Sequence, residues 1–476
     1  MKLKLIAAGA LLALAPEFLS AFCGFYVSKA DGTLKNKTSQ VIMVRDGNRT
    51  VITMYNDFKG NIKDFAMVVP VPVVLRKDDI HVVDQSIFQI LNDYSAPRLV
   101  EYWDQNPCEP YPVEDKVYSK SEKMMVVMNA AATAKNKDFG VKVEAKYLVG
   151  EYDILILSAK ESGGLKEWLN TNGYKIPEGA EEVLDPYIKS NLKFFVVKVN
   201  EAEKKKLPGN FLRPLQIGFN SPKFMLPIRL GMANADGDQD LIVYAFSRKG
   251  RVECTNYRTV NIPTDKNIPL FIQKNFNAFY ANLFDRQWKN EDKSVAFLEY
   301  AWDVSPANYY HCDPCIATVP SQQDLVTSGV WWLNDNGSGN AHFTRLHVRY
   351  NRKSFPQDLM FQVTPNTETF QARYVITHPA KGNFSCAAGQ KYMRELRNKR
   401  RGELRELMTL TGKSIYDWQN DVSSAIEETD DANTQYASLM PEIDNESRGA
   451  DFPTGIVFMS VVLIGSASFM RWKGYI

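Results

Sequence analysis

The tightest group of reactive side chains in the sequence is Cys312-Asp313-Pro314-Cys315. A close cysteine pair can form a disulfide, and it can exchange disulfides with other thiols where one thiolate is stabilised. The negative charge of Asp313 would raise the pKa of the neighbouring thiols and so disfavour a thiolate. A helix N-terminus at Cys315 would stabilise a thiolate, but Pro320 argues against a long helix that begins there. A structural disulfide is therefore our first hypothesis, and thiol–disulfide redox chemistry at Cys312 and Cys315 is the alternative.

Zinc is a third option for this motif, because His311 would join the two cysteines as a ligand. A closed zinc site needs a fourth ligand, and the sequence has no second Cys-x-x-Cys motif to supply it. In an oxidising compartment all six cysteines are candidates for structural disulfides, namely Cys23, Cys108, Cys254, Cys312, Cys315 and Cys386. Six cysteines allow fifteen connectivities, and the sequence does not choose among them.

A run of oxygen-bearing side chains could collect a calcium ion: Asn234, Asp236, Asp238 and Asp240. Calcium prefers oxygen ligands, but the EF-hand pattern fails here because its glycine and its final glutamate are misplaced. We expect an acidic hairpin turn, with weak calcium binding as the alternative. No other cofactor is predicted.

Basic side chains cluster at Arg394, Arg397, Lys399, Arg400 and Arg401. On a helix they form either a solvated face or a face that binds an anionic partner such as lipid headgroups. The whole chain is nearly neutral, with 57 Lys+Arg against 55 Asp+Glu, which argues against a nucleic-acid-binding protein. A hydrophobic fraction of 45% excludes a wholly disordered chain.

No strong catalytic constellation stands out in the sequence. His342 and His347 lie five positions apart, so they point to opposite faces of a strand and do not suit a shared metal site. Trp331 and Trp332 could stack on sugars, although aromatic residues in a β-rich domain more often belong to the core. We therefore favour a binding protein over an enzyme, and a calcium- or carbohydrate-binding module is the third hypothesis.

Both ends of the chain have the composition of targeting or membrane segments. A short charged start, an apolar run from Leu5 to Ala15 and small residues before Phe22 predict a signal peptide over residues 1–21. A lipid on Cys23 is disfavoured, because the residue before a lipidated cysteine is small and Phe22 is large.

At the other end, the stretch from Thr454 to Met470 carries no charge and is followed by Arg471 and Lys473. This pattern predicts a transmembrane helix over 454–470 and a cytoplasmic tail over 471–476. The rest of the mature chain then lies outside the cytoplasm, in the periplasm or the extracellular space. A buried core helix and a removable sorting tail are the alternatives.

Between these segments we expect an α+β, β-rich ectodomain over residues 22–386, built as one or two subdomains. The turn Asp46-Gly47-Asn48 favours a tight hairpin. Alternating apolar residues predict hairpins over 39–57, 141–157 and 224–246.

Continuous apolar runs predict further strands, and Pro70 marks an edge strand or a bulge. Residues 112–140 are polar and predict an insertion or loop. The predicted strands span 65–74 and 193–199, and the predicted helices span 83–94, 165–172 and 180–190.

After Cys386 the apolar residues recur at helical spacing. A helical module is predicted over 387–428, with Gly412 ending one helix and Ser414 with Asp417 beginning the next as a capping box. Residues 429–453 are strongly acidic and predict a solvated linker to the membrane anchor.

Several ordered motifs resemble the bacterial family called domain of unknown function 2330. They are Cys23-Gly24-Phe25, Ser39-Gln40-Val41, Val51-Ile52-Thr53-Met54, the run from Phe65 to Pro72, the run from Tyr94 to Val100, and Cys312-Asp313-Pro314-Cys315. The resemblance extends from Cys23 to the region of Cys386, and it implies an exported protein, often with one C-terminal span. It implies no activity and no catalytic residue.

Together these patterns predict an exported protein with a single membrane anchor. Its most favoured role is that of a non-catalytic binding or assembly subunit of the bacterial envelope, with another envelope protein as its partner.

Overall fold

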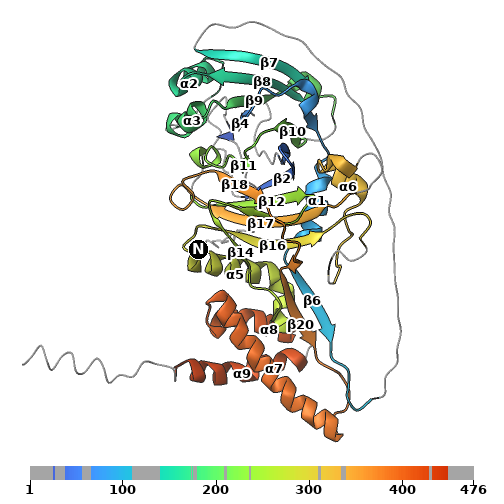
Figure 1. Cartoon of the computed structure of the whole chain (residues 1–476). Helices are drawn as coiled ribbons and strands as arrows, with labels where there is room; N and C mark the ends of the chain where they lie inside the picture. Colours follow the sequence, from blue (N-terminus) through green and yellow to red (C-terminus); the bar gives the residue numbers. More distant parts are fainter. Residues whose placement is uncertain are drawn as a thin grey trace, which may run out of the picture. The chain divides into compact units, whose positions relative to one another are not determined.

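The structure is a computed structural model (Figure 1). It describes residues 25–26, 38–55, 66–109, 140–172, 174, 180–207, 212–234, 237–308, 312, 314–333, 339–427 and 431–448. The predicted signal peptide, transmembrane helix and cytoplasmic tail lie outside these residues, as does most of the predicted polar loop over 112–140. Among the helices that the structure does describe, none is both long enough and apolar enough to cross a membrane.

The chain divides into two compact units. Unit 1 comprises Met1–Pro97, Lys120–Ile262 and Trp288–Ala372, and unit 2 comprises Arg98–Ser119, Pro263–Gln287 and Arg373–Ile476. The predicted α+β, strand-rich class is confirmed in the described residues. The division differs from the predicted boundary at residue 386, because unit 2 draws strands from three separate parts of the chain.

Unit 1 contains a nine-stranded sheet whose central strands are apolar on both faces. Its order is β14 (Arg258–Asn261), β16 (Val295–Asp303), β17 (His342–Tyr350), β12 (Gln239–Ser247), β2 (Thr38–Asp46), β3 (Arg49–Met54), β10 (Leu215–Asn220) and β5 (Ile80–Val82), with β19 (Phe370–Gln371) beside β16. The predicted first hairpin is confirmed as β2 and β3, and Gly47 in its turn has a φ of 55°.

A second, five-stranded antiparallel sheet belongs to the same unit. Its order is β1 (Phe25–Tyr26), β4 (Ala66–Val71), β9 (Lys193–Val199), β8 (Tyr152–Ala159) and β7 (Val141–Val149), which confirms the predicted hairpin around Gly150. The prediction of an edge strand or a bulge at Pro70 is wrong in the described sheet, because β4 lies between β1 and β9 and Pro70 is directly opposite Phe194 in an unbroken register.

Three apolar clusters hold these layers together. One packs between the facing sides of the two sheets and includes Met43 of β2 and Val197 of β9. The outer face of the five-stranded sheet is covered by α2 (Ser162–Thr171) and α3 (Ala180–Lys189), as Figure 1 shows. The outer face of the nine-stranded sheet is covered by α1 (Ser86–Ser95) and α6 (Gln322–Thr327).

The predicted hairpin over 224–246 is wrong. β11 (Met225–Leu226) pairs with β18 (Leu359–Val363) in a small sheet that also contains β13 (Val252–Cys254), whereas β12 pairs with β2 and β17. Alternation located the strands but could not assign their partners, because β12 is buried on both faces and its neighbours are distant in sequence.

Unit 2 contains a short parallel sheet and a group of helices. The sheet comprises β15 (Lys266–Asn267), β20 (Arg373–His378) and β6 (Arg98–Trp103). The helical elements are η4 (Leu270–Asn275), the first part of α5 (Phe276–Asn290), α7 (Ala387–Thr411), η6 (Ile415–Trp418), α8 (Gln419–Glu427) and α9 (Asp431–Arg448). Both predicted helix boundaries are confirmed: Gly412 caps α7 with a φ of 67°, and Ser414 and Asp417 form a capping box.

The predicted acidic linker over 429–453 is wrong in its described part, where α9 forms instead. Tyr436, Leu439, Met440 and Ile443 recur at helical spacing and are buried. This apolar stripe outweighs the acidic composition, because burying it stabilises the helix against the rest of unit 2.

Two disulfides connect described cysteines. Cys108 and Cys386 join across a sequence separation of 278 residues, and Cys312 bonds Cys315 across a separation of 3. Cys254 was wrong as a disulfide candidate among the described cysteines, since it is a buried free thiol whose pKa burial raises to about 12. Cys23 lies outside the described residues.

We predict that the two disulfides contribute unequally to stability. In the chain-entropy model, a cross-link over nearly 300 residues stabilises by about 5 kcal/mol and one over a few residues by about 2 kcal/mol. The Cys108→Ser/Cys386→Ser variant should therefore lose more free energy of unfolding in urea than the Cys312→Ser/Cys315→Ser variant. Equal losses would show that loop closure does not govern these two bonds.

Candidate functional site

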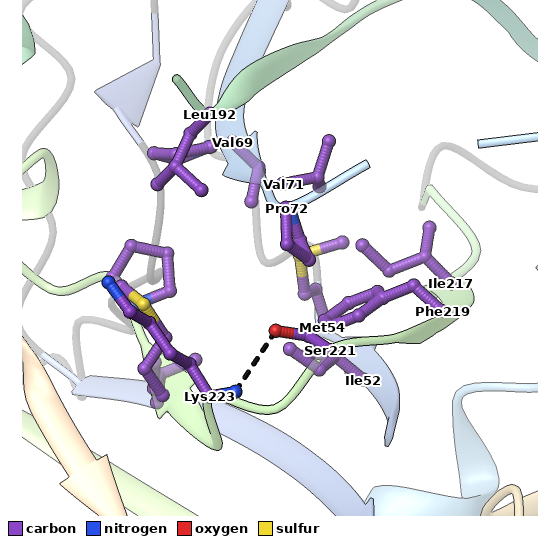
Figure 2. A pocket seen from close by; sticks show the side chains of 14 residues that line it. Ile52, Met54, Val69, Val71, Pro72, Leu192, Ile217, Phe219, Ser221 and Lys223 are labelled. Atoms are coloured by element: carbon purple, nitrogen blue, oxygen red, sulfur yellow. Dashed lines mark hydrogen bonds between the residues drawn. The ribbon is translucent and has the colours of Figure 1, made fainter. Parts of the chain in front are cut away.

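An apolar pocket lies between the two sheets of unit 1 (Figure 2). Its cavity volume is about 40 Å³. Its lining is Ile52, Met54, Val69, Pro70, Val71, Pro72, Leu192, Ile217, Phe219, Ser221, Lys223, Met225, Leu226 and Pro227. An apolar lining is typical of small-ligand sites in proteins, and a ligand longer than a few atoms enters a cavity of this size only if the side chains around it move apart.

Local sequence explains the walls of the pocket. On one side β3 and β10 pair so that Ile217 is directly opposite Ile52, and both side chains belong to the core between the sheets. On the other side β4 ends at Val71, directly before Pro72. Proline has a fixed φ and no N–H, so it does not continue a ladder of hydrogen bonds. The pocket lies beside this strand end.

The segment after β10 is held in place by polar contacts. The N–H of Ser221 donates to the carbonyl of Asn48 at 2.8 Å, and the Ser221 hydroxyl accepts from the N–H of Lys223 at 3.1 Å (Figure 2). Arg45 donates to the carbonyl of Pro222 at 3.3 Å. These contacts tie the segment to the turn of the first hairpin, so this wall is preformed.

The chemistry of the lining is simple. It contains one charged group, Lys223, which is exposed and forms no ion pair with a described residue. It contains no histidine, cysteine, aspartate or glutamate, so it offers neither a general base nor a metal ligand set. The arrangement can bind an apolar group and place a negative charge beside the lysine.

Elsewhere in unit 1, a charged cluster lies on strands β12, β16 and β17, with Arg345 and Glu299 buried and its other members half-buried. Arg345 donates to Glu299 at 2.6 Å, and the two ring nitrogens of His347 lie 2.8 Å from Glu299 and 3.3 Å from Asp240. Arg349 donates to Asp240 at 2.7 Å. Because side chains alternate along β17, its three basic residues share one face and meet carboxylates on both neighbouring strands.

These contacts set the protonation of the cluster. Burial alone would lower the pKa of His347, but the nearby Glu299 carboxylate and hydrogen bonds to Asp240 and Glu299 raise it above its ordinary value. Burial would raise the pKa of Asp240, yet His347 and Arg349 hold it at about 2. Glu299 and Asp240 are both bonded to side chains of β17, which is the arrangement of an ion-pair cluster that fixes the register of neighbouring strands.

The predicted calcium residues are not gathered into a site in the described part of the chain. Asp240 is bound to His347 and Arg349, and Asp238 accepts from the Asn351 amide at 2.6 Å. Asp236 lies outside the described residues, and Asn234 belongs to η3 (Gly231–Asn234). No group of three or more histidine, cysteine, aspartate or glutamate side chains among the described residues could hold a metal ion.

The predicted cysteine motif forms a disulfide on a surface loop, with Cys315 exposed. The next described helix, α6, begins at Gln322, so no helix N-terminus adjoins Cys315. Of the predicted sugar-stacking residues, Trp332 is buried and donates to the carbonyl of Asn340 at 3.0 Å. Trp332 therefore belongs to the core.

The predicted basic residues lie on α7 and mostly have acidic partners within unit 2. Arg400 is fully buried and bonds Glu403 at 3.0 Å. Arg397 and Arg401 both bond Glu442, and Lys399 lies 3.7 Å from Asp104. Arg394 is exposed. The cluster thus ties α7 to its neighbours, which leaves little of its charge for an anionic partner.

Sequence reasoning missed the pocket and the charged cluster. The pocket gave no local signal, because its lining comes from segments that are distant in sequence. The cluster did give one: Arg345, His347 and Arg349 alternate with the apolar residues Leu346 and Val348, and basic side chains drawn into a fold need carboxylates nearby.

We predict that His347 stabilises the fold more at low pH than at high pH. Its folded pKa is raised, so its contribution is complete below its unfolded pKa and is lost as the pH rises through the folded pKa. The His347→Gln variant should lose about 1–3 kcal/mol in urea unfolding at pH 5.5 and less at pH 9. The exposed His81→Gln serves as control. A loss that grows with pH would contradict this account.

Comparison with known proteins gives one result. A family model described as an uncharacterized protein conserved in bacteria (DUF2330) matches residues 18–362, which include the pocket, the charged cluster and the Cys312–Cys315 pair. No curated protein and no solved structure matches the chain. The match covers most of the chain and confirms the resemblance in the motifs, so the protein belongs to this bacterial DUF2330 family.

Proposed function

We propose that this protein is an exported, membrane-anchored and non-catalytic binding subunit of the bacterial envelope. We propose further that its pocket takes the acyl chain of an anionic amphiphile. Export is supported by the leader over 1–21 and the apolar stretch over 454–470. The two disulfides add support, because such bonds persist in oxidising compartments.

The apolar pocket with a single lysine carries the proposal. Side chains such as Ile52, Val69 and Ile217 surround a bound hydrocarbon chain and release water from it. Lys223 is exposed among the lining residues and supplies a cation for an acidic headgroup. The lining holds Ser221 and Lys223 but no histidine, cysteine or carboxylate that could activate them, so binding rather than reaction is the chemistry it supports.

The backbone of the wall favours an acyl chain over a peptide. A peptide strand that adds to a sheet edge is held by main-chain hydrogen bonds. Pro70, Pro72 and Pro227 stand in the wall and have no N–H to donate. A hydrocarbon chain accepts no hydrogen bonds, so the missing N–H groups of these prolines do not weaken its binding.

We predict that the full-length protein in detergent binds decanoate and decanol, measured by displacement of a fluorescent fatty acid. Lys223→Met should weaken decanoate binding about 3- to 5-fold, because one partly exposed ion pair contributes up to about 1 kcal/mol, and should leave decanol unchanged. Met225→Trp fills the pocket and should weaken both ligands at least tenfold.

Two matched variants control for general effects. Lys249→Met removes another exposed lysine outside the pocket lining, and Met360→Trp makes the same change at the position paired with Met225 across β18. Both should bind like the parent protein. The proposal fails if Met225→Trp and Met360→Trp bind equally, or if decanoate and decanol respond alike to Lys223→Met.

The exposed disulfide favours a second candidate, a thiol–disulfide redox protein that uses Cys312 and Cys315. The reduction potential of thioredoxin is about −270 mV, and a redox-active pair would be reduced at that potential. We predict that the Cys312–Cys315 bond stays oxidised at that potential, since α6, the next described helix, begins at Gln322 and offers Cys315 no helix N-terminus to stabilise a thiolate. Thiol labelling after equilibration in dithiol buffers measures this potential, and a value above −270 mV would favour the redox function.

A further inference from the structure

Trp103 is the most exposed large hydrophobic side chain among the described residues, with 66% of its surface accessible. It ends strand β6 in unit 2 and is directly opposite His378 of β20. The two rings stack with centroids 4.8 Å apart and planes 5° from parallel. One face of the indole is therefore supported by the imidazole, while much of the ring remains open to solvent.

A chain of hydrogen bonds holds this stack in one orientation. His378 Nε2 lies 2.8 Å from the Glu101 carboxylate, which also accepts from the Gln273 amide at 2.9 Å. The N–H of Asp104 donates to the carbonyl of His378 at 2.9 Å. A ring fixed in this way loses little conformational entropy when a ligand stacks on it.

Polar side chains also lie on the segment that follows Trp103. Asp104 accepts from the Tyr392 hydroxyl at 3.1 Å, and the Asn106 amide donates to the carbonyl of Lys381 at 3.1 Å. The disulfide between Cys108 and Cys386 anchors the end of the segment that begins at Asp104. The segment after Trp103 is thus tied covalently to the start of α7, and the carboxylate in contact with the stack is that of Glu101.

We infer that the stacked Trp103 is a binding platform for a neutral saccharide. The C–H face of a pyranose ring is apolar and slightly positive, and it meets the negative face of an indole. A hydroxyl group at the edge of the sugar can bond the Glu101 carboxylate, which lies on the same face of β6 as Trp103. Glu101 disfavours acidic sugars through like-charge repulsion.

Other ligands fit this geometry less well. A quaternary ammonium ion is bound by a cage of several aromatic rings, but Tyr102 is adjacent to Trp103 on the strand and so points to the opposite face. An apolar protein anchor would take water away from the neighbouring Glu101 carboxylate. The inference is independent of the acyl-chain pocket, because the platform belongs to unit 2 and the pocket to unit 1.

The test uses the full-length protein labelled with 5-fluorotryptophan, with the Trp103 signal assigned by its loss in Trp103→Phe. We expect the N-acetylglucosamine trimer or maltotriose to shift that fluorine signal saturably, and the other tryptophan signals to stay in place. Saccharide saturation-transfer spectra give a second readout, which Trp103→Ala should abolish.

Two further variants separate stacking from folding. His378→Ala removes the support and should weaken binding several-fold, whereas His378→Phe keeps a ring beneath Trp103 and should retain it. Tyr102→Ala removes the exposed aromatic of the opposite face and should bind like the parent protein. The inference is overturned if neither saccharide moves the Trp103 signal, or if lipid vesicles or a protein partner move it and the saccharides do not.

Discussion

The removal of apolar surface from water between the two sheets of unit 1 is the interaction on which the rest of that unit depends. Strands β2 and β12 lie at the centre of the nine-stranded sheet, and their alternate side chains serve two cores at once. Val41 and Val243 face the five-stranded sheet, whereas Ile42 and Tyr244 face the covering helices. A one-residue slip would exchange these two sets, so burial on both faces fixes the register.

The pocket and the charged cluster are two consequences of this layered packing. The pocket lies where β4 ends before Pro72, beside β3 and β10, and its walls are mostly apolar. The charged cluster lies on the outer face of β12, β16 and β17, where each cation is matched by a carboxylate. Lys223 in the pocket has no ion-pair partner among the described residues, whereas the charged groups of the cluster bond one another. This contrast is why we assign binding to the pocket and stability to the cluster.

Local features of the fold could be predicted from the sequence, but distant pairings could not. The Asp46-Gly47-Asn48 turn, strand β9, the Gly412 cap and the Ser414–Asp417 capping box each depend on a few adjacent residues. The parallel pairing of β12 with β2 and the Cys108–Cys386 bond join positions far apart, and nothing local specifies them. Likewise Ile52 and Ile217 meet in the pocket only because their strands pair. Helix α9 was missed because acidic composition obscured its apolar stripe.

The central claim is that the protein carries an anionic amphiphile in the pocket of unit 1. Native mass spectrometry of the full-length protein, extracted from bacterial membranes in mild detergent, tests it directly. The account predicts a bound species with the mass of an acyl-chain acid or anionic lipid, retained in Met360→Trp and absent in Met225→Trp. A protein that carries no such species, or one that carries it equally in both variants, would contradict the account.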